Sequence, residues 1–171
     1  MTNTHTIKLV VHGAAGRMGQ RIVACAVAEP DQWQIVGAID SGSHPRLGED
    51  AGQVAGVGDL GVALTTSWGT PADVVIDFSL PGALRGISEV CVQRNVPLVV
   101  ATTGLEPDDK AAINEAVQSV PVLVSPSMSL AVNIAMDLVG RAGRLLRGVG
   151  SRADVEIIEC HHHHKEDAPS G

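Results

Sequence analysis

Short apolar runs alternate with longer amphipathic stretches along most of the chain, and this alternation limits the fold more than any other feature. Residues 7–12 and 74–77 are mostly apolar runs of the kind that forms buried strands in a parallel sheet. Residues 17–29 carry apolar side chains at helical spacing. Because strand–helix–strand order requires crossover connections, the sequence predicts an α/β fold with a doubly wound parallel sheet and helices on both faces.

The other expected elements continue this alternation to the end of the chain. The other strands are expected at residues 33–39, 62–66, 97–101 and 121–125, and in a different sheet at 154–160. The other helices are expected at residues 81–94, 107–119 and 129–147, and the glycine-rich stretch 42–61 is expected to be loop. Ligands bind at the carboxyl ends of strands in such sheets, so the loops that follow the strands are where a site is expected.

The loop after the first expected strand has the sequence Gly-Ala-Ala-Gly-Arg-Met-Gly at residues 13–19. Its glycines let the backbone turn tightly and approach a diphosphate, and the following helix offers unpaired N–H groups to that anion. Asp40 ends the second expected strand and is suited to accept hydrogen bonds from an adenosine ribose. A glycine turn without a ligand is the alternative, but strand, helix and acid together favour dinucleotide binding.

The residue after Asp40 bears on the choice between NADH and NADPH. It is Ser41 rather than an arginine. An acid without an adjacent base repels a 2′-phosphate, which favours NADH. Arg17 and Arg46 remain candidates to reach a phosphate, so the preference stays open.

Two later strand ends carry small polar residues where a nicotinamide ring would lie. The first is Asp77-Phe78-Ser79, and the second includes Thr102 and Thr103. A simple turn before the next helix explains the two threonines equally well. Residues 125–128 have the composition of an N-terminal cap for the longest helix.

Four consecutive histidines, residues 161–164, follow Cys160 near the end of the chain. The run is embedded in continuing sequence, which argues against an affinity tag. Adjacent residues of an extended chain point to opposite faces and no second ligand cluster accompanies them, so no metal site is expected. Histidines next to Lys165 instead suit proton transfer and the binding of a dicarboxylate.

Composition excludes several classes of function. The net charge is −7 and aromatic residues are 2% of the chain, which disfavours nucleic-acid binding. No apolar run approaches the roughly 18 residues of a membrane span, and no secretory signal is evident, so a cytoplasmic protein is expected. The three cysteines form no C-x-x-C pair and are expected to be reduced and mostly buried.

Several motifs occur together and in order: residues 13–19, Asp77-Phe78-Ser79, Ala-Thr-Thr-Gly at 101–104, and the E-x-H-H-x-x-K-x-D-x-P-S-G segment at 159–171. With them the whole chain resembles the 4-hydroxy-tetrahydrodipicolinate reductase family of lysine and diaminopimelate biosynthesis. The resemblance implies a Rossmann-like cofactor domain at residues 1–128. It also implies that residues 129–171 begin a second domain, whose mixed sheet forms a homotetramer. The implied reaction is NAD(P)H-dependent reduction of 4-hydroxy-tetrahydrodipicolinate, with loss of water.

The resemblance also implies roles for individual residues. His161 and Lys165 would transfer protons, while His162 and the turn at Gly171 would bind the substrate carboxylates. The cofactor would be bound by Gly13, Ala14, Ala15, Gly16, Arg17, Met18, Asp40, Ala101, Thr102, Thr103, Ser125, Pro126, Ser127 and Met128.

Family members continue for on the order of 100 residues beyond the position of Gly171. We therefore expect a truncated protein, poorly active and aggregation-prone by itself because the strand expected at 154–160 lacks partners. Three alternatives stay open: a non-catalytic nucleotide-sensing module, a zinc protein using Cys160 and the histidines, and a related reductase acting on another imine or carbonyl acid.

Overall fold

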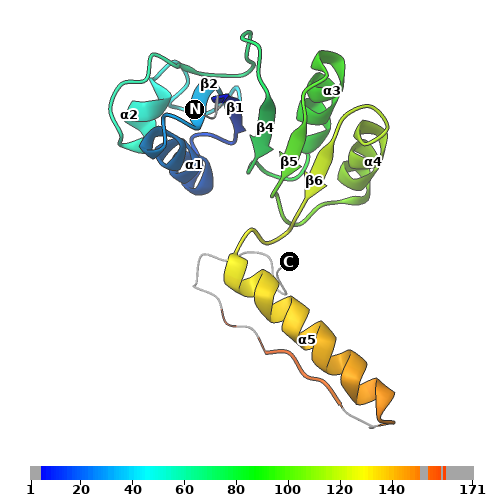
Figure 1. The fold of residues 1–171 in the computed structure, drawn as a ribbon. Coiled ribbons are helices and arrows are strands. Elements are labelled where there is room, and N and C mark those ends of the chain that lie inside the picture. The colour runs from blue at the N-terminus through cyan, green and yellow to red at the C-terminus, as the bar shows by residue number, and fades with distance from the viewer. Residues whose placement is uncertain (1–4, 151–153, 159, 161–171) are drawn as a thin grey trace. The chain divides into compact units, whose positions relative to one another are not determined.

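The structure is a computed structural model and describes residues 5–150, 154–158 and 160. The chain divides into two compact units, Met1–Val124 and Ser125–Gly171. The first unit contains a β-sheet flanked by helices, and the second contains one long helix (Figure 1).

The first unit is built on a parallel six-stranded sheet. Its strands are β1 (Ile7–His12), β2 (Trp33–Ile39), β3 (Leu64–Thr65), β4 (Val74–Asp77), β5 (Leu98–Val100) and β6 (Val122–Val124). They lie in the order β3-β2-β1-β4-β5-β6, and every neighbouring pair is parallel. The strand order reverses between β1 and β4, so the carboxyl ends of these strands flank the switch point of a doubly wound sheet. The predicted fold class is confirmed.

Helices cover both faces of this sheet. They are α1 (Arg17–Ala28), α2 (Ala51–Ala55), α3 (Leu84–Arg94) and α4 (Pro107–Ala116). Leu9 and Val11 of β1 pack with side chains of α1 and α2 in one apolar cluster. Val10, which alternates with them, packs with side chains of α3 and α4 in a second cluster. Because successive strand residues point to opposite faces, α1 and α2 cover one face and α3 and α4 the other.

Helix α2 lies inside the stretch that the sequence predicted to be loop. Asp50 explains it, because its side chain accepts hydrogen bonds from the N–H groups of Gly52 and Gln53 and caps the helix. The same carboxylate accepts from the N–H groups of Leu60 and Val62, so it also closes the following loop. An aspartate that can cap a helix is recognisable in a sequence. A helix of only five residues within a glycine-rich stretch is not, because it is too short to show helical spacing of apolar residues.

Helix α3 begins at Leu84, later than the predicted start at Pro81. Gly82 has a φ of +83°, and this left-handed conformation keeps residues 81–83 out of the helix. Strand β3 is also shorter than the predicted 62–66. The other predicted strands and helices of this unit have the predicted bounds or differ from them only at their ends.

The second unit contains α5 (Leu130–Gly148). Its N-cap is Ser129, whose side chain accepts a hydrogen bond from the N–H of Val132, so the cap is not at residues 125–128 as predicted. The strand predicted at 154–160 is also wrong for the described part, since residues 154–158 are not in a strand. A strand needs a hydrogen-bonded partner, and none of the described strands pairs with this segment.

Two expectations from composition can be compared with the structure. Cys91 is buried, but Cys25 and Cys160 are exposed, so the prediction of mostly buried thiols was wrong. Within the described residues, no helix combines the length and the apolar character needed to cross a membrane.

Candidate functional site

The loops that follow β1, β2, β4 and β5 meet at one edge of the sheet, because parallel strands all end there. The loop after β1, residues 13–19, is called the glycine loop below. Its residues Gly13, Ala14 and Ala15 are buried, while Gly16, Arg17 and Met18 are exposed. The loop is therefore anchored at its start and open where α1 begins.

Two glycines of this loop have no room for a side chain. Gly13 has a φ of +76°, and a Cβ added there would lie 2.6 Å from the carbonyl oxygen of Phe78. A Cβ on Gly19 would overlap the carbonyl oxygen of Gly13 and lie 2.6 Å from the Cα of Ala14. The backbone here is packed against itself and against the loop after β4, as the close turn of a dinucleotide loop requires.

The N–H groups at the start of the glycine loop are used within the protein. Those of Gly13 and Ala14 donate to the carbonyl oxygen of Ile39, and that of Gly16 donates to Gly13. Gly16 is also the N-cap of α1 and offers no side chain to cap it. Within the described residues, the N–H groups of residues 17–19 have no acceptor, so these donors are the ones available to an anion.

Asp40, directly after β2, binds the glycine loop. Its Oδ2 accepts from the N–H of Ala15 at 2.9 Å, and its Oδ1 accepts from the N–H of Ser41 at 2.8 Å. The residue is half-buried, and each carboxylate oxygen has a further lone pair. The structure thus places the predicted ribose-binding acid against the predicted diphosphate loop, a contact that spacing alone did not reveal.

A largely buried polar cluster, called the carboxyl-end network below, links the ends of β1, β4 and β5. It consists of His12, Asp77, Ser79 and Thr102. His12 Nδ1 lies 2.6 Å from Asp77 Oδ1, which also accepts from the hydroxyl of Ser79 at 2.6 Å. The hydroxyl of Thr102 donates to Asp77 Oδ2 at 2.7 Å. One carboxylate therefore ties together the ends of three strands.

Asp77 is fully buried, yet its surroundings favour the charged form. Burial alone would raise the pKa of this carboxyl, but hydrogen bonds from His12, Ser79 and Thr102 outweigh burial and lower it below its usual value of 3.8. Burial, together with the charge of Asp77, raises the pKa of the nearby Cys91 thiol to about 12. Asp77 is thus an anion at neutral pH and Cys91 is neutral.

Sequence reasoning assigned Thr102 and the Asp77-Phe78-Ser79 loop to the nicotinamide side but missed His12 as their partner. The sequence carried part of the signal, because His12 and Asp77 each end a predicted strand, but it did not show that the two strands are neighbours. Those strands are parallel neighbours, and the two residues are paired in register. Two polar residues facing each other in a buried position must satisfy each other.

The remaining predicted site residues fall into three groups. Ala101 is buried and Thr103 is half-buried in the loop after β5, beside Thr102. Residues 125–128 belong to the second unit. His161, His162, Lys165 and Gly171 lie outside the described residues.

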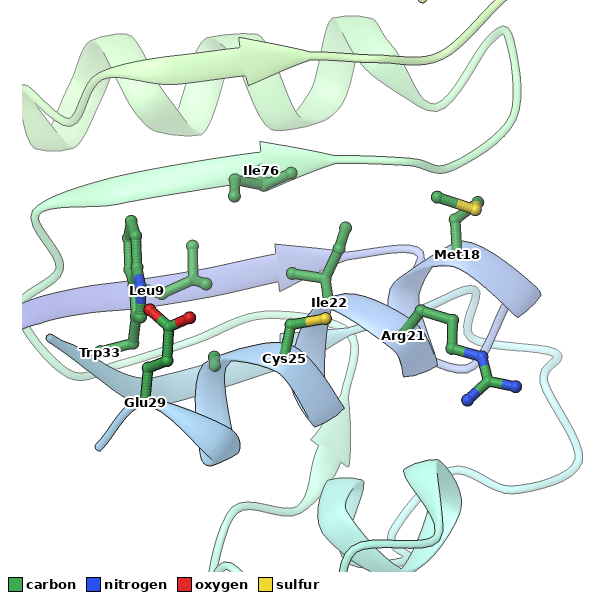
Figure 2. Close-up of a pocket in the computed structure, with 9 residues that line it drawn as sticks. Leu9, Met18, Arg21, Ile22, Cys25, Glu29, Trp33 and Ile76 are labelled. Carbon is green, nitrogen blue, oxygen red and sulfur yellow. The ribbon is translucent and has the colours of Figure 1, made fainter. Parts of the chain in front are cut away.

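A cavity of about 300 Å³ lies beside α1 on the sheet face that this helix covers (Figure 2). Its walls are mainly apolar and include Ile22 and Cys25 of α1, Trp33 of β2 and Ile76 of β4. Of the predicted cofactor-binding residues, Met18 alone contributes to it. An apolar cavity along the helix does not supply the donors that a diphosphate requires. The candidate site is therefore the edge of the sheet formed by the carboxyl ends of its strands, called the carboxyl edge below.

Comparison with known proteins gives consistent results for both units. Residues 7–128 match the family model described as dihydrodipicolinate reductase, N-terminus, and residues 131–171 match the one described as dihydrodipicolinate reductase, C-terminus. A 4-hydroxy-tetrahydrodipicolinate reductase from Rhodopirellula baltica is 48% identical over 99% of this chain and 62% of its own length. One from Anaeromyxobacter dehalogenans is 45% identical over 96% of this chain and 60% of its own length. The chain thus spans about three fifths of these relatives.

Solved structures support the same fold. A dipicolinate-bound dihydrodipicolinate reductase from Paenisporosarcina sp. TG-14 matches 98% of this chain and 62% of its own, with a TM-score of 0.66 and 23% identity. A myo-inositol 2-dehydrogenase from Lactobacillus plantarum matches 81% of this chain and 42% of its own, with a TM-score of 0.58 and 13% identity. At these identities the likeness concerns the fold.

Proposed function

The chain belongs to the dihydrodipicolinate reductase family, and on that premise we propose that it carries the cofactor-binding domain and the beginning of the substrate domain of a 4-hydroxy-tetrahydrodipicolinate reductase. The reaction is the NAD(P)H-dependent reduction of 4-hydroxy-tetrahydrodipicolinate to tetrahydrodipicolinate and water, in lysine and diaminopimelate biosynthesis. The observation that carries the proposal is the glycine loop, hydrogen-bonded to Asp40 at the switch point of a parallel sheet.

The residues present fit a dinucleotide. The N–H groups of residues 17–19 have no acceptor within the described part of the chain and suit a diphosphate. The remaining lone pairs of Asp40 suit ribose hydroxyls. Residues 101–103 follow β5 at the same end of the sheet and would contact the nicotinamide side. Residues 125–128 are assigned to that side by the family resemblance alone. When bound, the reduced nicotinamide supplies the hydride.

The substrate residues come from the family resemblance. Lys165 would donate a proton, and His161 would donate or accept one, where charge develops on the ring nitrogen. Protonation makes the imine a better acceptor of hydride. His162 and the N–H groups at Gly171 would bind the two carboxylates. The solved relative that binds dipicolinate, a cyclic dicarboxylate, supports this substrate class.

We infer a preference for NADH over NADPH. The Asp40 carboxylate would repel a 2′-phosphate, and Arg46 is already paired with Glu49 at 2.8 Å. A hydrogen bond from Arg46 lowers the pKa of Glu49, so the pair stays charged on both sides and the arginine is less available to a phosphate. Arg17 is the remaining cation in the glycine loop itself.

We further propose the division into a cofactor domain at residues 1–128 and a substrate domain from residue 129. In its support, the two family models meet between residues 128 and 131, and the compact units divide between Val124 and Ser125. The proposed homotetramer rests on the family resemblance, and the proposed cytoplasmic location rests on the sequence expectation given above.

Titration of the 171-residue chain with NADH and NADPH by isothermal calorimetry tests the cofactor assignment. We expect NADH to bind more tightly, and Asp40→Ala to weaken NADH binding about tenfold, since it removes acceptors for the ribose and for the N–H of Ala15. Asp59→Ala is the matched control, because that carboxylate accepts within its own turn, from Gly61. Absence of binding to either coenzyme would overturn the proposal.

The catalytic assignment is tested in a protein extended to the length of its relatives. Lys165→Ala should lower kcat by about 100-fold or more, the usual contribution of a proton donor, while NADH affinity stays unchanged. An unchanged kcat would remove Lys165 from the mechanism.

A further inference from the structure

His12 is the last residue of β1 and immediately precedes the glycine loop. None of the roles implied by the family resemblance falls on it. Its ring is turned toward β4, where Nδ1 meets Asp77, and so away from β2 and Asp40. If the cofactor spans the carboxyl edge as proposed above, with its adenosine at Asp40 and its diphosphate at α1, its nicotinamide half extends to the side on which His12 lies.

The contact with Asp77 determines which nitrogen of His12 carries a hydrogen. Asp77 accepts from Ser79 and Thr102 as well, and an ionised carboxylate can only accept. The 2.6 Å contact at Nδ1 therefore requires a hydrogen on Nδ1. In the neutral ring, the other nitrogen, Nε2, is then an acceptor with a lone pair.

The Nε2 atom is open to a ligand. Within the described residues it has no hydrogen-bond partner, and it is not among the buried polar atoms that lack one. The side chain is 11% exposed, so part of it reaches the surface. A ring fixed at one nitrogen and accessible at the other is arranged to bind rather than only to fill the core.

We propose that His12 is a cofactor-contacting residue, with Nε2 accepting a hydrogen bond from an O–H or N–H group on the nicotinamide half of the bound dinucleotide. Asp77 acts through His12 as a positioning residue. This inference rests on the proposed function and adds a residue and a hydrogen-bond direction to it. The donor is either a hydroxyl of the nicotinamide ribose or the carboxamide of the ring, and ADP-ribose separates the two because it keeps a ribose and lacks the ring.

The variant His12→Asn tests the contact by calorimetry with NADH, ADP-ribose and ADP. The Asn amide nitrogen lies as many bonds from Cα as Nδ1, so it preserves a donor to Asp77, but nothing replaces Nε2. We expect NADH affinity to fall about three- to tenfold, the effect of one hydrogen bond, with ADP affinity unchanged. If the affinity for ADP-ribose falls as much as that for NADH, the donor is a hydroxyl of the nicotinamide ribose. If only the affinity for NADH falls, the donor is the carboxamide. His5→Asn, at the opposite end of β1, is the control and should change neither affinity.

Unchanged NADH affinity in His12→Asn, while the wild type binds, would overturn this inference and leave the proposed function standing. Failure of the wild type to bind would overturn both. Imidazole ¹⁵N shifts of the wild-type protein give an answer that does not depend on the folding of a variant. Addition of NADH should move the Nε2 signal of His12 and leave its Nδ1 signal in place, and an unmoved Nε2 signal would refute the contact.

Discussion

A histidine–aspartate pair lies at each end of the neighbouring strands β1 and β4, one pair just before the strands begin and one at their last residues, and the two pairs differ sharply. At the amino end, His5 Nε2 lies 3.4 Å from Asp73 Oδ2, with side chains 77% and 41% exposed. At the carboxyl end, His12 Nδ1 lies 2.6 Å from Asp77 Oδ1, with side chains 11% and 0% exposed. The same two residue types form an exposed surface contact before these two strands begin and a buried contact where the strands end.

The comparison shows that residue identity does not determine what a polar pair does. Asp73 has a lowered pKa chiefly because the backbone N–H of Lys8 donates to it, with a smaller contribution from His5, and its side chain is exposed. Such exposed pairs contribute little to stability. Asp77 is removed from water, so every donor that it has lost must be replaced by His12, Ser79 or Thr102. The buried pair fixes the loops beside the candidate cofactor site.

The largest expected difference between the two ends is in stability. Asp77→Ala removes the carboxylate that accepts from the buried His12 and Thr102 and from the half-buried Ser79, and we expect it to lower the free energy of unfolding by about 3 to 5 kcal/mol. Asp73→Ala should cost far less, because water replaces the lost contact. Urea unfolding of the two variants, followed by circular dichroism, measures both values. Similar losses would show that burial does not distinguish the two pairs.

A second expected difference concerns the backbone next to each pair. Gly13→Ala, beside His12, forces a left-handed φ on alanine and brings its Cβ to 2.6 Å from the carbonyl oxygen of Phe78. We expect it to cost about 1 to 3 kcal/mol and to weaken NADH binding. Gly69→Ala lies in the loop that leads into the amino end of β4, where nothing is within 4 Å of the added Cβ, and it should change stability by less than about 0.5 kcal/mol. Thermal unfolding and NADH titration of both variants check this, and an unaffected Gly13→Ala protein would contradict the close packing of the loop.

The sheet and most helices could be predicted because alternating apolar runs report burial directly, as in β1 and β4. The glycine loop and Asp40 could also be predicted, because a glycine-rich loop between a strand and a helix, followed by an acid at the end of the next strand, is typical of dinucleotide binding. Helix α2 could not, because its stability depends on four N–H groups converging on Asp50, a contact among residues up to twelve positions apart. The His12–Asp77 pair depends on strand order, which periodicity does not give.

The carboxyl-end pair should also determine how the protein responds to acid. The folded-state pKa of Asp77 is lowered below 3.8, so the unfolded chain binds a proton more readily and the stabilisation by this carboxylate is lost as pH falls through the folded-state value. The difference in unfolding free energy between the wild type and Asp77→Asn should therefore narrow below about pH 4, by at most about 1.4 kcal/mol per pH unit for one proton. Asp50, whose pKa is about 2 because four backbone N–H groups outweigh its burial, is present in both proteins and cancels in the difference.

Urea unfolding at a series of pH values measures this difference in unfolding free energy. Asp73→Asn is the control, whose effect has the same sign and is smaller. If the difference in unfolding free energy already narrows near pH 6, a group other than the Asp77 carboxylate determines the pH dependence of this network.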